Sequence, residues 1–129
     1  MLSGSDDKSV RLWDIRSGQQ IQVFNGHTNS VLSVEYSQFV IKSNNDVIGG
    51  KSNVICSGSW DNTIRFWDVR SNKNELYMIK GDKKGDDGIL DFKFIELKKK
   101  EKNYENIKNG THNLNLCYSS SEARICIWG

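Results

Sequence analysis

Three residues of this chain have the side-chain types of a hydrolytic triad, namely His27, Ser57 and Asp61. In such a triad a histidine takes the proton of the attacking serine and a carboxylate orients the imidazole. The residues around Ser57, Cys-Ser-Gly-Ser-Trp, contain neither a nucleophile elbow nor the pattern of an oxyanion hole. We therefore expect no catalytic residue in this chain.

Metal and cofactor chemistry also lack the residue spacing that they need. The chain has two histidines and three cysteines, but they are not spaced like the ligands of a zinc site. It also has no glycine-rich phosphate loop. We expect no metal and no cofactor, and we expect the cysteines to be reduced thiols inside the cell.

The residues around Ser57 belong to an internal repeat. Residues 3–18 align with residues 57–72 at an offset of 54, with nine identical positions. A third copy, at residues 118–129, follows at a further offset of 61. Each copy has an apolar or small-residue stretch, a turn and an alternating stretch, which is typical of a β-hairpin. The turn residues are favourable in the first two copies and poorer in the third, where they are Glu-Ala-Arg.

Further alternating segments follow or precede these hairpins. They lie at residues 19–26, 30–37, 74–81 and 88–97. Together with the hairpins they predict ten short antiparallel strands and no helix. The expected order along the chain is three strands, then four, then three.

Two insertions separate the predicted strands. Residues 38–53 are rich in asparagine and glycine, and residues 98–113 are rich in lysine. We interpret both as loops. The alternative for Lys98–Lys108 is contact with phosphate or an acidic partner, but a net charge of +2 does not favour nucleic acid. No apolar run is long enough to span a membrane.

The repeats resemble those of the WD-repeat (β-transducin-type) propeller family. Gly26-His27 would open one repeat and Trp67-Asp68 would close it. The resemblance implies an all-β fold, a partial β-propeller of about two and a half four-stranded antiparallel blades. The complete ring is expected to have seven blades. Further blades would then be missing from this chain. The expected units are an incomplete blade at 1–26, a complete blade at 27–81 and an incomplete blade at 82–129.

The resemblance also implies a structural tetrad of His27, Ser57, Asp61 and Trp67 in the complete blade. The chemistry is reasonable, since a buried indole N–H needs an acceptor and an imidazole can join a hydroxyl to a carboxylate. Asp82 stands where the third unit would have its histidine, so we expect the hydrogen-bond network of that unit to be absent. The partial sets in the other two units are Ser3, Asp7 and Trp13, and Glu122 and Trp128.

Related propellers bind proteins and peptides on the face that carries the hairpin turns, which implies a non-catalytic interaction scaffold. An exposed Trp60 would be a rigid anchor for such a partner, and the alternative is that it packs on a neighbouring loop. The other positions that the resemblance implies for partner binding are Asp6, Ser30, Leu32, Gly88, Leu90 and Ser121.

A second functional hypothesis comes from the form Trp-Asp-x-Arg, which occurs in two consecutive units. It resembles the motif of substrate receptors for cullin-4 ubiquitin ligases. Arg16 and Arg70 would then bind adaptor carboxylates or carbonyls on the face opposite Trp60. The alternative is that each arginine pairs with a neighbour in its own unit.

Overall fold

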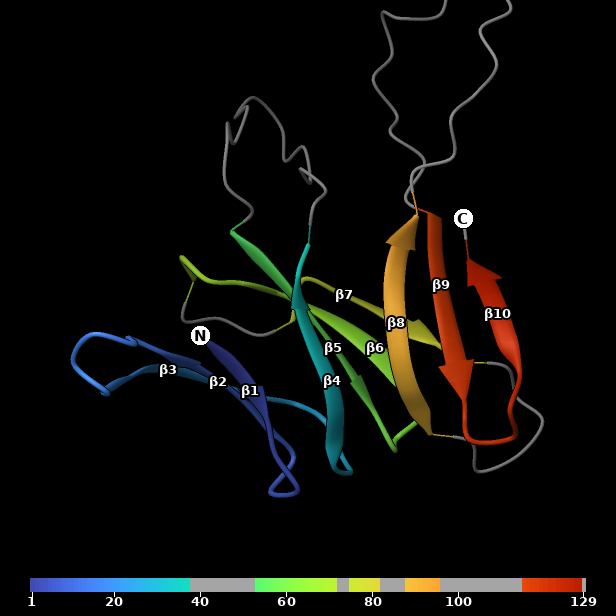
Figure 1. Ribbon diagram of the computed structural model, residues 1–129, viewed down its shortest axis with the longest axis horizontal. Helices are drawn as coiled ribbons and strands as arrows, with labels where there is room; N and C mark the ends of the chain where they lie inside the picture. The colour runs from blue at the N-terminus through green and yellow to red at the C-terminus, as the bar shows by residue number, and fades with distance from the viewer. Residues whose placement is uncertain (38–52, 72–74, 82–87, 96–114, 129) are drawn as a thin grey trace, which may run out of the picture.

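The computed structural model describes residues 1–37, 53–71, 75–81, 88–95 and 115–128. Their backbone forms ten strands in three antiparallel sheets, which follow one another as an arc (Figure 1). The predicted all-β fold and its order of three, four and three strands are confirmed. The described residues contain no helix that could span a lipid bilayer.

The three sheets have the strand order of the repeats. The first sheet contains β1 (Leu2–Gly4), β2 (Ser9–Trp13) and β3 (Gln20–Asn25). The central sheet contains β4 (Val31–Tyr36), β5 (Val54–Ser59), β6 (Thr63–Asp68) and β7 (Tyr77–Lys80). The third sheet contains β8 (Ile89–Ile95), β9 (Asn115–Ser120) and β10 (Ile125–Trp128).

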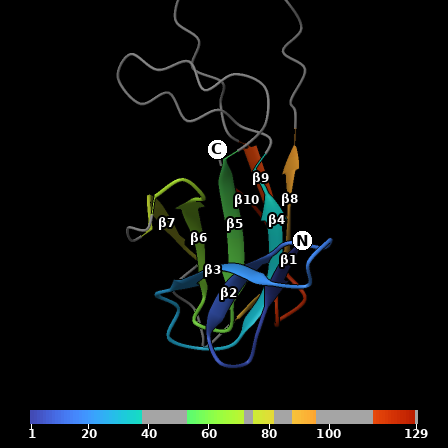
Figure 2. The same ribbon diagram turned by 90° about the vertical axis from the view of Figure 1, so that its left-hand side faces the viewer.

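The central sheet packs against a neighbouring sheet on each face. Every residue of β5 is buried, because the first sheet covers one face and the third sheet covers the other. Figure 2 shows the first sheet lying across the central one. Side chains alternate between the faces of a strand, so Ile55 packs toward the first sheet and Cys56 toward the third.

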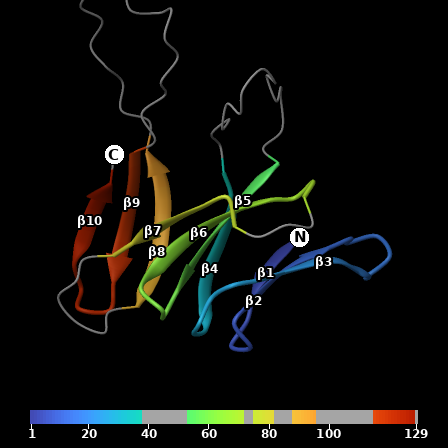
Figure 3. The same cartoon turned by 180° about the vertical axis from the view of Figure 1, so that it is seen from behind.

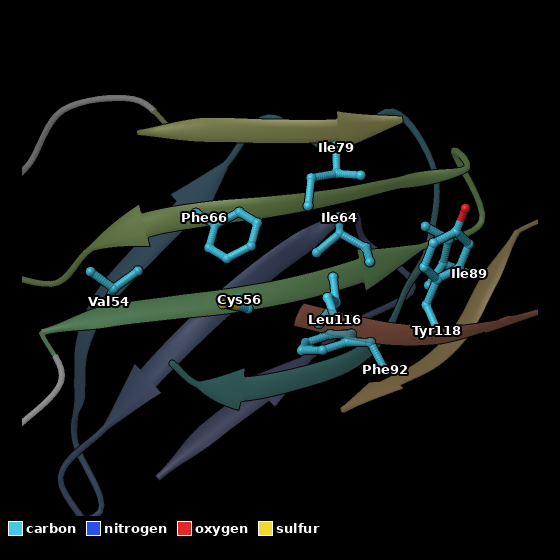
Figure 4. Close-up of a cluster of buried hydrophobic side chains, with 9 residues drawn as sticks. All are labelled: Val54, Cys56, Ile64, Phe66, Ile79, Ile89, Phe92, Leu116 and Tyr118. Carbon is cyan, nitrogen blue, oxygen red and sulfur yellow. The ribbon is translucent and has the colours of Figure 1, made fainter. Parts of the chain in front are cut away.

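Two apolar clusters join the sheets. The cluster between the first and central sheets is formed by Val10, Leu12, Phe24, Val31, Ile55 and Trp67. The cluster between the central and third sheets is larger, and Figure 4 shows how its side chains meet between the strands. Its members are Val54, Cys56, Ile64, Phe66, Ile79, Ile89, Phe92, Leu116 and Tyr118.

Glycine in the Ser-Gly-Ser motif permits this close stacking. A Cβ on Gly4 would lie 2.7 Å from Cγ1 of Val31 in the central sheet. A Cβ on Gly58 would lie 3.0 Å from Cγ2 of Ile89 in the third sheet. The two glycines occupy equivalent repeat positions, so the motif sets the distance between neighbouring sheets.

The three hairpin turns lie along the same edge of the three sheets, at the bottom of Figure 3. Each places one residue in the left-handed region, with φ values of 74° for Lys8, 61° for Asn62 and 60° for Ala123. These residues are equivalent in the three repeats. The sequence suggested a poorer turn in the third copy, and its backbone nevertheless adopts the same conformation.

The insertions at 38–53 and 98–113 lie almost entirely outside the described residues. The same holds for Asp82 and for the lysine-rich segment. The hypotheses about those residues stay predictions.

Candidate functional site

A chain of hydrogen bonds runs through the central sheet from an indole to a carboxylate. Trp67 Nε1 lies 2.8 Å from Ser57 Oγ, and Ser57 Oγ lies 2.7 Å from His27 Nε2. The other ring nitrogen, His27 Nδ1, lies 2.8 Å from Asp61 Oδ2. The structure thus brings together the four residues that the sequence analysis grouped.

The donors and acceptors determine the direction of this relay. The indole N–H can only donate, so Ser57 Oγ accepts from Trp67. An ionised carboxylate can only accept, so His27 donates from Nδ1 to Asp61. In a neutral imidazole Nε2 is then the acceptor, and it receives the hydroxyl proton of Ser57. Every polar atom along the path has a partner with the opposite role.

Strand order explains why these four side chains meet. Ser57 on β5 and Trp67 on β6 lie on the sheet face that the first sheet covers. Asp61 lies in the turn between these strands, and His27 lies in the connection that leads from β3 into β4. The antiparallel pairing of β4 with β5 brings that connection back beside the turn.

Asp61 accepts more hydrogen bonds than the one from His27. The backbone N–H of Thr28 donates to Oδ2 at 2.9 Å, and the backbone N–H of Thr63 donates to Oδ1 at 3.0 Å. The Thr63 hydroxyl also donates to Oδ1, at 2.5 Å. Burial acts to raise the pKa of Asp61, but the hydrogen bonds from His27, Thr63 and Thr28 outweigh it and hold this pKa well below its usual range.

The relay is closed to solvent. Ser57 has no exposed surface and Trp67 is 2% exposed. The rings of Phe24 and His27 both lie against Trp67, with centroid distances of 5.9 and 6.0 Å. Ser57, His27 and Asp61 thus have the connectivity of a hydrolytic triad, but complete burial keeps a substrate away from the hydroxyl.

The first sheet contains part of the same arrangement. Trp13 Nε1 donates to Ser3 Oγ at 2.8 Å, as Trp67 does to Ser57. Asp7 accepts from the backbone and the hydroxyl of Ser9, at 3.0 and 2.5 Å. Hydrogen bonds from Ser9 lower the pKa of Asp7 well below its usual range.

The corresponding residues of the third sheet make different contacts. Glu122 forms an ion pair with Arg124, with 2.7 Å between Oε2 and Nη2. The Trp128 ring packs at a centroid distance of 6.1 Å from the ring of Tyr77 in the central sheet. Glu122 and Trp128 therefore engage separate partners.

Sequence reasoning missed the contribution of Thr63, Arg65 and Glu75. Arg65 donates from Nη1 to Glu75 Oε2 at 2.7 Å and from Nε to the Thr63 hydroxyl at 3.3 Å. The available signal was internal, because Ser9 and Arg11 occupy the equivalent positions of the first repeat and make the equivalent Nε contact at 3.1 Å.

A second group of predicted residues lies on the edge of the sheets that carries the hairpin turns. Leu32 is 38% exposed, and Trp60 and Leu90 are each 40% exposed. The strand register shifts between Val31 and Ser33, and again between Ile89 and Asp91. Leu32 and Leu90 are therefore equivalent bulge residues, and a bulge turns a side chain away from the regular face.

The Trp60 ring is partly packed and partly exposed. A Cβ on Gly88 would overlap the Trp60 ring, so part of this ring packs on the entry to the third sheet. The Trp60 backbone N–H donates to the Ser30 carbonyl at 3.0 Å, and that of Ser121 donates to the Gly88 carbonyl at 3.1 Å. Asp6 is exposed in the first turn. Gly88, which the sequence analysis also expected at the partner, is buried beneath the Trp60 ring. We call the other six residues the turn surface, namely Asp6, Ser30, Leu32, Trp60, Leu90 and Ser121.

Arg16 follows β2 and Arg70 follows β6, each at the end of its strand that lies away from the hairpin turn. Arg70 pairs with Asp68, with Nη2 3.1 Å from Oδ2, and this hydrogen bonding lowers the pKa of Asp68. Arg16 is exposed, and its backbone N–H donates to Asp14 Oδ1 at 3.1 Å. The predicted local pairing is present for Arg70.

Two further expectations concern metals and thiols. Within the described ranges, His, Cys, Asp and Glu side chains form no group of three that could hold a metal ion. All three cysteines are free thiols, and burial raises the pKa of Cys56 far above its usual value.

Comparison with known proteins places the chain in a family. The WD40 family profile, described as WD domain, G-beta repeat, matches residues 1–14 and 18–68. The chain belongs to the WD40 family.

Relatives of this WD40 chain match it over a little more than half its length. A guanine nucleotide-binding protein subunit beta of Oryza sativa subsp. japonica is 39% identical over 75 residues, which are 54% of this chain and 17% of that protein. The general transcriptional corepressor TUP1 of Saccharomyces cerevisiae is 39% identical over 67 residues, or 52% of this chain and 9% of TUP1. A Denticleless protein homolog of Gallus gallus is 31% identical over 75 residues, or 58% of this chain and 9% of that protein. The chain thus spans less than a fifth of the length of these relatives.

Proposed function

We propose that this chain is part of an intracellular, non-catalytic scaffold that binds a peptide or protein partner on the turn surface. The observation that carries the proposal is the exposure of Trp60, Leu32 and Leu90 on the edge of the sheets that carries the hairpin turns. Large apolar side chains with this exposure, on rigid hairpin turns and bulges, can anchor a partner at little entropic cost.

The buried relay supports this role by holding the turn in place. Asp61 follows Trp60 directly, and its carboxylate is tied to His27, Thr28 and Thr63. Trp60 is therefore presented by a turn whose backbone is constrained on both sides. The tetrad in this proposal is structural, and the partner meets only the turn surface.

Selection from a random-peptide display library would test the proposal. Peptides enriched on the wild-type chain should bind Trp60→Ala and Leu90→Ala at least about tenfold more weakly, the loss expected for a contact worth 1.4 kcal/mol. Ile15→Ala is a matched control, because Ile15 is 75% exposed but lies beyond the opposite end of its strand. Enriched peptides that are insensitive to both turn-surface substitutions, or a library that yields none, would overturn the proposal.

Adaptor binding through Arg16 and Arg70 is the alternative function. Both side chains are exposed, but the Arg70 guanidinium is engaged by Asp68, which favours the turn surface as the site. A pull-down with a cullin-4 adaptor distinguishes the two, since unchanged recovery of the adaptor by the Arg16→Ala/Arg70→Ala variant would exclude this alternative.

A further inference from the structure

An asparagine-glycine pair lies directly ahead of the relay histidine. Asn25 is the last residue of β3, and Gly26 connects it to His27. An asparagine followed by glycine is prone to deamidation, because glycine has no Cβ to hinder attack by its backbone nitrogen on the asparagine side chain. In a folded chain the reaction also requires that this side chain and this nitrogen are free to meet.

The Asn25 side chain is free. Asn25 and Gly26 are both exposed, and no group in the described part of the chain hydrogen-bonds to the Asn25 side-chain amide. Lys80 holds the equivalent position in the central sheet and is also exposed, although the first sheet covers that face. The exposure of this position therefore does not require an uncovered sheet.

The backbone nitrogen of Gly26 is free as well. In the central sheet the equivalent Gly81 donates its N–H to the Asn62 carbonyl at 2.9 Å. Lys8 holds the place of Asn62 in the first turn, but no acceptor among the described residues receives the Gly26 N–H. Removal of the proton from the attacking nitrogen thus breaks no existing hydrogen bond.

The reaction consumes water and needs no other reactant. The Gly26 nitrogen would form a bond to Cγ of Asn25, the Cγ–Nδ2 bond would break, and ammonia would leave with the proton of the backbone amide. Water then opens the cyclic imide at one of its two carbonyls. Hydrolysis of the new N–Cγ bond leaves aspartate, whereas hydrolysis at the backbone carbonyl leaves isoaspartate, whose main chain is one carbon longer. No atom is oxidised or reduced.

The additional carbon of isoaspartate would enter the backbone where there is little room. A Cβ on Gly26 would lie 2.9 Å from Cη2 of Trp67, so this glycine packs closely on the central sheet. The next residue, His27, lies 2.7 Å from Ser57 Oγ and 2.8 Å from Asp61 Oδ2. A longer backbone ahead of His27 must therefore shift either the packed glycine or the imidazole.

We propose that Asn25 is a site of spontaneous deamidation, and that isoaspartate formed there breaks the relay through His27. The chain would then lose its central hydrogen-bond network through chemical ageing of an exposed side chain. This modification is independent of partner binding on the turn surface, so failure of either proposal leaves the other as it is.

Incubation of the full chain at neutral pH tests the chemistry. Peptide mapping and labelling by an isoaspartyl methyltransferase identify the product, and cleavage after lysine and arginine separates Asn25 from Asn109, which also precedes a glycine. Asn25 should convert to acid and accept the methyl label. Its rate should lie within about tenfold of that of a synthetic peptide of residues 20–28, so that folding adds less than about 1.4 kcal/mol to the barrier.

Asn25→Gln is the matched control, because glutamine must close a larger ring and reacts far more slowly. Incubated wild-type chain should contain an isoaspartyl fraction that unfolds at lower urea concentration and has a shifted Trp67 indole N–H resonance. Incubated Asn25→Gln should keep its original urea midpoint. Fresh Asn25→Asp, which has the charge without the additional carbon, should be as stable as wild type.

Two results would overturn the proposal. One is conversion of Asn25 in the folded chain more than about tenfold slower than in the peptide. The other is an isoaspartyl fraction with the urea midpoint of the fresh chain.

Discussion

At the scale of single residues, polar groups are what distinguish this core. Ser57, His27 and Asp61 would each be costly to bury alone, since an unpaired polar group loses its hydrogen bonds to water. Here each has a partner of the correct donor or acceptor type. Removal of one member should therefore cost more than the value of one hydrogen bond, because another buried group is left without its partner.

Truncation of the indole should be the most damaging change to the relay. Trp67→Ala should lower the free energy of unfolding by about 3–5 kcal/mol, through a large cavity and an unsatisfied Ser57. His27→Ala should cost about 1–3 kcal/mol. Urea denaturation measures both. Trp60→Ala is the control, since its ring is 40% exposed, and a cost as large as that of Trp67→Ala would contradict this assignment of the two tryptophans.

The depressed pKa of Asp61 predicts loss of stability in acid. Unfolded aspartate has a pKa of about 3.9, and the folded residue protonates only at lower pH. Below about pH 4 the unfolded chain therefore binds a proton that the folded chain does not, and the free energy of unfolding falls. Denaturation in urea between pH 3 and pH 7 should show this fall in the wild-type chain.

Asp61→Asn isolates the contribution of this one carboxylate from that of the other aspartates. The variant should be less stable at pH 7 and should lose less stability between pH 5 and pH 3. Asp6→Asn, an exposed substitution in the first turn, should leave the pH profile as it is. Parallel profiles for wild type and Asp61→Asn would show that other groups cause the acid dependence.

At the scale of elements, the hairpin turns determine how the relay is assembled. Each turn needs one residue with positive φ, and the three repeats supply Lys8, Asn62 and Ala123. Asparagine tolerates this conformation better than alanine does, since its short polar side chain can hydrogen-bond locally. The third turn thus carries strain that the second does not.

Ala123→Asn should stabilise the chain by about 0.5–1 kcal/mol, because it relieves a left-handed alanine. Ala123→Gly should also stabilise it, but by less, since glycine adds freedom to the unfolded chain. Both appear as an increase in melting temperature. Ala123→Val should lower it, and an order other than Asn, Gly, Ala, Val would contradict the turn geometry.

At the scale of the whole molecule, stacking decides whether a repeat position is core or surface. Ile64 and Ile125 are equivalent in the second and third repeats. Ile64 is fully buried against the third sheet, whereas Ile125 is 75% exposed on the outer face of that sheet. The two residues have the same type and the same place in their hairpins, so only the neighbouring sheet differs.

This equivalence allows a matched pair of substitutions. Ile64→Ala should cost about 2–5 kcal/mol, as a cavity in a packed core does. Ile125→Ala should change the free energy of unfolding by less than about 0.5 kcal/mol, as surface substitutions do. Both are measured by urea denaturation of the 129-residue chain. A similar cost for the two would show that the outer face of the third sheet is covered in solution.

The sequence by itself determined the strands, the turns and the membership of the relay. The repeat and its alternating pattern indicated ten strands in the order three, four and three, because side-chain alternation and turn chemistry are local properties. The resemblance to WD-repeat propellers grouped His27, Ser57, Asp61 and Trp67, which the structure joins in one chain of hydrogen bonds.

Only the tertiary structure decided what each repeat position meets. It packs part of the Trp60 ring on Gly88, directs Arg65 to Glu75 but Arg11 to Asp7, and buries Ile64 but not Ile125. None of these outcomes follows from alternation within one strand. Each depends on which sheet lies next to the residue, and sheet stacking is set by contacts between segments that are far apart in the chain.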